Sequence, residues 1–168
     1  MEIIGHVQLI AAIVMLVAIL RRRVVLVLVA WTLILAALVV DDLFMIHERV
    51  GTTLVGLLGL PSLAGLRGQD MGELIVWGAM IVPLGIVLVI GHLRAGPSDR
   101  RDSRALLIRV AILAAFAVAL DAVSHPLGAL VPPIVGTGLT LVETSGELIA
   151  MSLILVAVHR MTLRPSTV

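Results

Sequence analysis

The sequence predicts an all-α, polytopic membrane protein, organised as one domain of residues 1–168 that forms a bundle of five transmembrane helices. Hydrophobic residues make up 60% of the chain, whereas a soluble domain is usually about 45–50% apolar. The mean hydropathy of +1.18 indicates the same class. The apolar residues also come in runs of about 20, the length that crosses a bilayer as a helix. The lack of cysteine excludes disulfides, thiolate metal sites and a cysteine nucleophile.

Five segments have the length and hydropathy of a membrane span. The first is expected to be a retained helix rather than a cleaved signal peptide, because Glu2 precedes it and Arg21 to Arg23 follow it. Pro83 lies inside the third and should remove one backbone hydrogen bond there. The fourth ends at His125-Pro126, since a residue before proline disfavours the helical conformation. The predicted spans are residues 3–20, 24–48, 71–93, 103–125 and 139–159.

Two connections between these spans differ in character. Residues 51–70 are rich in glycine and leucine and contain Pro61, so the segment is too short and too broken to span a membrane. It is expected to be a re-entrant or interfacial segment, or a loop that caps the bundle. Residues 95–104 are polar and charged, which places them in water.

The arginines predict the orientation of the chain. Most of them fall at one set of span ends, and by the positive-inside tendency this side is cytoplasmic. Five spans then place the N-terminus outside and the C-terminus in the cytoplasm, in a multi-pass protein of the cell membrane. All basic residues except histidine are arginine, which is typical of a high-GC bacterial genome and favours the bacterial inner membrane. The arginines on the cytoplasmic side are Arg21, Arg22, Arg23, Arg94, Arg100, Arg101, Arg104, Arg160 and Arg164, and those on the outer side are Arg49 and Arg67.

Nearly all acids and imidazoles of the spans fall in their outer halves. A titratable group inside a membrane is costly, and it persists where it pairs, binds an ion or faces a wet cavity. The sequence therefore predicts that these side chains form one site near the extracytoplasmic face. They are Asp41, Asp42, His47, Glu48, Glu73, Asp121, His125, Glu143 and Glu147.

Helical spacing selects among these residues. Asp121 and His125 are four apart, as are Glu143 and Glu147, so each pair shares a helix face. On a continuous second span, Asp41 and Glu48 are seven apart and separated by about 20° around the axis. Asp42 and His47 would point elsewhere on that span, so they are weaker ligand candidates.

Carboxylates at this density repel one another unless protons or cations neutralise them, and the interior of the predicted bundle offers no lysine or arginine for this purpose. A divalent ion resolves the conflict, and a carboxylate and imidazole set without thiolate favours Fe, Mn or Zn. We therefore predict a mono- or dinuclear metal site, with His47 or Glu73 as the candidate catalytic base or outer-shell residue. The predicted ligands are Asp41, Glu48, Asp121, His125, Glu143 and Glu147.

Several function classes remain open on this reasoning. The metal site would serve an enzyme that acts on a membrane-accessible substrate. The alternatives are a cation transporter or proton relay, and a non-catalytic subunit that binds a cofactor such as haem or quinone. Beyond the lipid bilayer, the expected partners are further copies of the chain, packed through glycines such as Gly85 and Gly91, or a larger membrane complex. Nucleic-acid binding is not expected, because the arginines are accounted for by membrane topology. A simpler interpretation of residues 41–49 is a solvated helix end.

Overall fold

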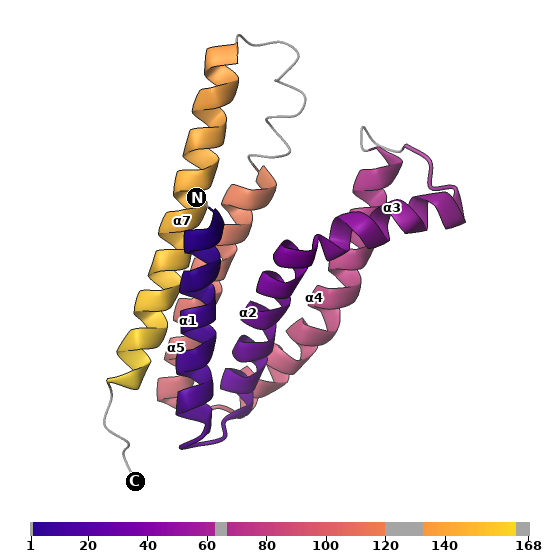
Figure 1. Cartoon of the computed structure of the whole chain (residues 1–168). Helices are drawn as coiled ribbons and strands as arrows, with labels where there is room; N and C mark the ends of the chain where they lie inside the picture. Colours follow the sequence, from indigo (N-terminus) through magenta and orange to yellow (C-terminus); the bar gives the residue numbers. More distant parts are fainter. Residues whose placement is uncertain (1, 63–66, 120–132, 164–168) are drawn as a thin grey trace. The chain divides into compact units, whose positions relative to one another are not determined.

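The computed structural model describes residues 2–62, 67–119 and 133–163, and within these ranges the chain is helical and contains no strand (Figure 1). The all-α prediction is therefore confirmed. Four of the described helices, namely α1, α2, α4 and α7, are long and apolar enough to cross a membrane, which identifies a membrane protein. The described α-helices are α1 (Glu2–Leu20), α2 (Leu26–Phe44), α3 (Ile46–Leu58), α4 (Gly68–Arg94), α5 (Pro97–Ala114) and α7 (Pro133–Thr162), and a π-helical turn, η1 (Ala115–Ala119), extends α5.

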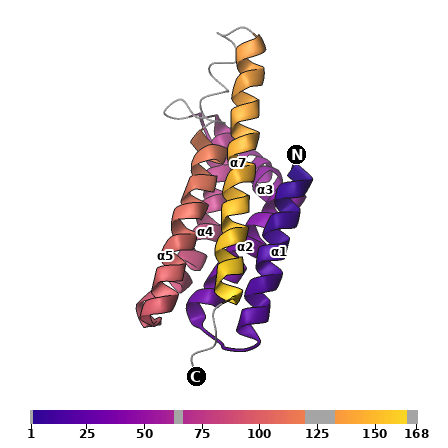
Figure 2. The ribbon, with the colours of Figure 1, turned by 90° about the vertical axis from the view of Figure 1, so that its left-hand side faces the viewer.

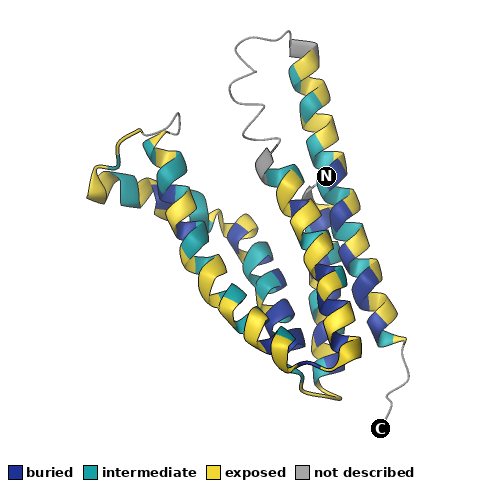
Figure 3. Ribbon diagram, turned by 180° about the vertical axis from the view of Figure 1, so that it is seen from behind, coloured by how far each residue is buried: buried dark blue, intermediate teal, exposed yellow. Residues whose placement is uncertain are grey.

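The helices group into two compact units. The first contains residues Met1–Arg23 and Gly96–Val168, hence α1, α5 and α7, and the second contains Val24–Ala95, hence α2, α3 and α4. In the first unit α7 packs against both α1 and α5 (Figure 2). In the second unit α4 packs against both α2 and α3. Large apolar side chains are exposed on both units, and Figure 3 shows α4 covered mostly by exposed and half-buried residues. Such surfaces are what lipid-facing helices present.

Small residues and one hydrogen bond join α1 to α7 in the first unit. A Cβ on Gly5 would collide with the side chain of Met151, so the two helices approach closely there. One turn further along, Gln8 Nε2 donates a hydrogen bond to Ser152 Oγ at 3.0 Å, and this hydroxyl donates to the carbonyl of Leu148 at 2.8 Å. Small residues and interhelical hydrogen bonds are the usual means of helix association where the hydrophobic effect gives little.

A proline and an ion pair stabilise the start of α5. Pro97 occupies the first helical turn, where its missing N–H costs nothing. Asp99 follows in the same turn, which favours a carboxylate because of the helix dipole. Its Oδ1 lies 2.9 Å from Nη1 of Arg23, at the end of the α1 segment. Polar and charged residues occupy the first two turns of α5, and the helix is described only as far as η1, so a full fourth span at 103–125 lies partly outside the described residues.

Backbone contact through glycine joins the helices of the second unit. A Cβ on Gly91 of α4 would lie 2.8 Å from the N and Cα atoms of Val27 in α2, so the two backbones touch. Gly91 therefore allows close packing of α4 against α2 of the same chain. A Cβ on Gly85, by contrast, would meet nothing within 4 Å. Pro83 lies inside α4, which continues through it as one helix from Gly68 to Arg94.

The second predicted span ends earlier than its hydropathy indicates. Residues 24–48 were expected to form one helix, but α2 stops at Phe44 and Met45 adopts the left-handed conformation with φ 51° and ψ 44°. A new helix, α3, begins at Ile46 within residues 46–58, so much of the 51–70 segment is helical rather than a loop. The left-handed conformation costs a non-glycine residue about 1–2 kcal/mol, and contacts formed only in the bent chain must offset it.

Candidate functional site

The bend at Met45 brings Asp41 and His47 together. Asp41 lies in the last turn of α2, and only 1% of its surface is exposed. Its Oδ1 accepts a hydrogen bond from the backbone N–H of His47 at 2.9 Å. Its Oδ2 lies 2.7 Å from Nδ1 of the same histidine. Both carboxylate oxygens of Asp41 therefore contact the same residue, which lies six positions further along the chain.

This pairing determines which ring nitrogen of His47 carries a hydrogen. An ionised carboxylate only accepts hydrogen bonds, so Nδ1 of His47 carries the hydrogen that it donates to Asp41. The neutral ring then has Nε2 as its free acceptor. Nε2 lies 3.9 Å from Oε1 of Glu48, beyond hydrogen-bond distance. The available atoms are thus an imidazole nitrogen and a carboxylate oxygen on adjacent residues.

Trp77 of α4 supports the ring of His47 from the side. The two ring centroids are 5.5 Å apart and the planes are inclined by 42°, which is a tilted aromatic contact. Contact with tryptophan restricts the rotation of the imidazole. Together with Asp41, Trp77 holds the ring in one orientation.

Asp41 also takes the place of an N-cap for α3. The residue at the N-cap position is Met45, whose side chain makes no capping hydrogen bond. The first N–H groups of a helix have no partner within that helix, and the carboxylate of Asp41 accepts one of them, from His47. A negative charge at this end is also favoured by the helix dipole. The same carboxylate therefore orients the ring and stabilises the start of α3.

The two glycines at the crossing of α3 and α4 set how closely these helices approach. A Cβ on Gly51 would lie 2.8 Å from the backbone N of Glu73, and a Cβ on Gly72 would lie 2.5 Å from the carbonyl oxygen of Gly51. Gly51 is one helical turn after His47, and Gly72 and Glu73 lie about one turn before Trp77. The close crossing thus keeps His47 against Trp77.

Glu73 lies in the same part of α4 but is engaged differently. Its Oε1 accepts a hydrogen bond from Gln69 Nε2 at 3.0 Å, within the first turns of the helix. Its side chain is half-buried, and its Cγ lies against Gly51. Glu73 is therefore near the crossing of α3 and α4 on which the position of His47 depends.

The other predicted ligands belong to the first unit. Glu143 and Glu147 are both half-buried on successive turns of α7, as their spacing predicts. Asp121 and His125 lie outside the described residues, so their predicted positions stay predictions. Among the predicted residues of the second unit, Asp42 is exposed beside the buried Asp41.

The described residues do not contain a complete set of metal ligands. Among residues 2–62, 67–119 and 133–163, no group of three or more histidine, aspartate or glutamate side chains is arranged to hold a metal ion. Within these ranges, Nε2 of His47 and Oε1 of Glu48 lie 3.9 Å apart. In this structure both oxygens of Asp41 contact His47, and the predicted ligand role of Asp41 stays a prediction.

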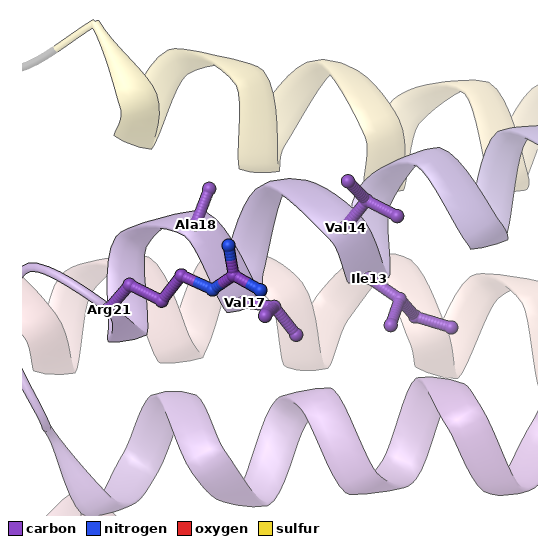
Figure 4. A pocket seen from close by; sticks show the side chains of 5 residues that line it. All are labelled: Ile13, Val14, Val17, Ala18 and Arg21. Carbon is purple, nitrogen blue, oxygen red and sulfur yellow. The ribbon is translucent and has the colours of Figure 1, made fainter.

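A groove on α1 offers no chemistry of this kind. It is lined by Ile13, Val14, Val17 and Ala18, with Arg21 at one end (Figure 4). Its lining is almost entirely apolar and holds no acid, imidazole or hydroxyl. The residue cluster at the bend between α2 and α3 is therefore the stronger candidate site.

The comparisons with known proteins place the chain in a family but name no activity. No curated protein and no solved structure gives a significant match to the chain. One family model, described as "Domain of unknown function (DUF8692)", matches residues 4–161. Because this match covers nearly the whole sequence, the chain belongs to that family of domains of unknown function.

Proposed function

We propose that the protein is an integral membrane metalloprotein, in which Nε2 of His47 and the carboxylate of Glu48 bind a divalent ion near the extracytoplasmic face. The observation that carries this proposal is the pair of hydrogen bonds that Asp41 accepts from His47. A histidine that binds a metal nearly always donates its other ring N–H to a carboxylate or carbonyl. Asp41 supplies such a partner, in a buried position where a carboxylate is otherwise expensive.

The spacing of the two donors is compatible with this role after a small movement. Two ligands bound about 2.0–2.1 Å from a tetrahedral zinc are about 3.3 Å apart. The present separation of Nε2 and Oε1 is 3.9 Å, and the side chain of Glu48 is half-exposed, at 43%, so it has room to rotate. An oriented imidazole and an adjustable carboxylate are the expected state of such a pair before the ion binds.

The sequence suggests which residues would complete the coordination of the ion and which class of reaction the ion would serve. Asp121, His125, Glu143 and Glu147 are the predicted donors that would complete the coordination of the ion. Iron, manganese or zinc fits a set of carboxylates and imidazoles without thiolate. When bound, such an ion would supply the activation of water or another small molecule toward a membrane-accessible substrate, and Glu73 would be the candidate base.

Metal analysis of the purified protein tests this proposal directly. We expect close to one or two ions per wild-type chain, and loss of bound metal in His47→Ala, Glu48→Gln, Asp121→Ala and Glu147→Ala. Asp41→Asn should weaken binding by about 10–100-fold, as is usual for the partner of a ligating histidine. Asp42→Asn is the matched control, because this exposed acid is adjacent to Asp41, and it should retain the metal. Equal, substoichiometric metal in the wild type and all variants would refute the proposal.

A second function, a proton or cation relay, is favoured by the hydrogen bond between His47 and Asp41. A carboxylate hydrogen-bonded to an imidazole can exchange a proton with it. In this case the purified protein would lack metal, and proteoliposomes would show ion flux that disappears in His47→Gln and Glu147→Gln. Metal in the wild type without such flux would exclude it.

The proposed topology has five spans, with the N-terminus outside and the C-terminus in the cytoplasm of a bacterial inner membrane. It is supported by the arginine distribution and by the helix that continues from α5 through η1 toward the predicted end of the fourth span. Because the chain has no cysteine, single-cysteine variants can be labelled selectively. A membrane-impermeant maleimide should label Thr52→Cys in intact cells and Ser98→Cys only after permeabilisation. Labelling of both from the same side would contradict this topology.

A further inference from the structure

α3 has two chemically different faces along its 13 residues. At about 100° per residue, Val50 and Leu57 are separated by about 20° around the axis, and Glu48 and Thr52 by about 40° on the opposite side. Val50 and Leu57 are 43% and 76% exposed, so the rest of the described chain leaves this apolar face uncovered. From these observations we propose that α3 lies flat in the outer interface of the bilayer, with the Val50–Leu57 face toward the acyl chains.

The position of α3 in the fold agrees with this placement. It starts directly after the membrane-spanning α2, and its Gly51 touches Gly72 in the second turn of α4. α3 therefore lies level with the end of one span and the beginning of the next, and Figure 1 shows it crossing the first turns of α4. At the boundary between headgroups and acyl chains, an amphipathic helix buries its apolar face to a depth of about 5–10 Å.

The polar groups of α3 are satisfied in a way that suits a water-poor interface. The hydroxyls of Thr52 and Thr53 donate to the carbonyls of Glu48 and Arg49, each at 2.8 Å. At the N-terminus, Asp41 accepts the N–H of His47. At the C-terminus, Gly59 takes the left-handed conformation with φ 60° and its N–H donates to the carbonyl of Val55, a common way to end a helix. Groups at both ends of α3 are thereby satisfied within the protein, which matters because an unsatisfied group is costly near lipid.

The exposed side chains of the neighbouring helices indicate that lipid covers the apolar face of α3. Large apolar side chains are also exposed on the two helices next to α3: Leu43 and Phe44 at the end of α2 are 53% and 59% exposed, and Leu74 in α4, which packs against α3, is 54% exposed. α2 and α4 have the length and hydropathy of membrane spans, so their exposed apolar side chains face acyl chains. An exposed apolar face on the helix next to them is covered by the same lipid, and no separate partner is needed.

Spin labels on single cysteines test the proposal, since the chain has no native cysteine to remove. The test positions are Val50→Cys and Leu57→Cys on the apolar face and Thr52→Cys on the opposite face, in protein reconstituted into phosphatidylcholine vesicles with a fraction of phosphatidylglycerol. Val89→Cys in α4, where the native side chain is 57% exposed, gives the lipid reference. Ser98→Cys, at an exposed position in the polar first turn of α5, gives the aqueous reference.

We expect the labels at positions 50 and 57 to collide with oxygen several-fold more often than with a water-soluble nickel chelate, as at position 89. The label at position 52 should show the reverse preference, as at position 98. Equal, water-like accessibility at positions 50, 52 and 57 would overturn the proposal and place α3 in solution. Dipolar broadening at positions 50 and 57 that disappears on dilution with unlabelled protein would also overturn it, because a second copy would then cover the face.

Discussion

Replacing Asp41 by alanine should lower the free energy of unfolding by about 2–4 kcal/mol and release the ring of His47. The carboxylate is 1% exposed and accepts two hydrogen bonds from His47, one from the backbone N–H and one from Nδ1. Removing a buried partner costs about 1–3 kcal/mol for each group left unsatisfied, and little water reaches this position to replace it. The left-handed Met45 would also lose the contacts that offset its conformational cost.

Two measurements check this expectation. Unfolding in mixed detergent micelles should show the loss of stability, and nitrogen NMR of the imidazole should show a mixture of tautomers in place of one Nδ1–H form. Asp42→Ala is the control on the adjacent exposed residue, with an expected change within about 0.5 kcal/mol. Asp41→Asn should retain an acceptor for the backbone N–H of His47 while changing the ring tautomer. Unchanged stability and tautomer in Asp41→Ala would show that the carboxylate does not hold the bend.

Replacing Gly51 by alanine should destabilise the protein by about 1–3 kcal/mol, as overpacking usually does. The new Cβ would lie 2.8 Å from the backbone N and 2.9 Å from Cγ of Glu73, and backbone cannot move aside as a flexible side chain can. α3 must therefore move away from α4, which also separates His47 from Trp77.

Gly56 in the same helix gives a control with the opposite expected sign. A Cβ there would meet nothing within 4 Å, and alanine in a helix is favoured over glycine by about 0.8–1.0 kcal/mol, so Gly56→Ala should stabilise. The separation of His47 and Trp77 can be followed by indole fluorescence in a Trp31→Phe background, since the chain has only two tryptophans. Stabilisation by Gly51→Ala, with unchanged fluorescence, would show that the helices do not touch at this point.

The membrane-spanning helices were predictable because they depend on length and hydropathy alone. The spans at 3–20 and 71–93 match α1 and α4 closely, and 139–159 lies within α7. The bend after Phe44 was not predictable in the same way. Met45 is neither glycine nor asparagine, the residues that usually mark a left-handed position, and apolar residues continue on both sides of it. Tertiary contacts, above all those of Asp41, decide the conformation there.

The sequence predicted that Asp41 and His47 belong to a site, but it did not predict the contact between them. The cost of a charge in a membrane singled out Asp41, and that side chain is indeed buried. The angular relations assumed one straight helix from residue 24 to residue 48, on which Asp41 and Glu48 share a face and His47 points away. The bend instead joins His47 to Asp41. The sequence did contain one signal, an acid and a histidine six residues apart near the end of a span. This spacing indicates a contact only if the chain turns between the two residues.

One carboxylate contributes to three features of the bend between α2 and α3. The contacts of Asp41 offset the unfavourable backbone of Met45, satisfy an N–H at the start of α3 and help to orient His47. Partial opening is therefore unfavourable, since it keeps the cost of the bend and loses the bonds that offset it. Any proton or cation that draws Asp41 away from His47 also loosens the helix that follows. The direction of the chain at this bend is thus coupled to the contact between Asp41 and His47.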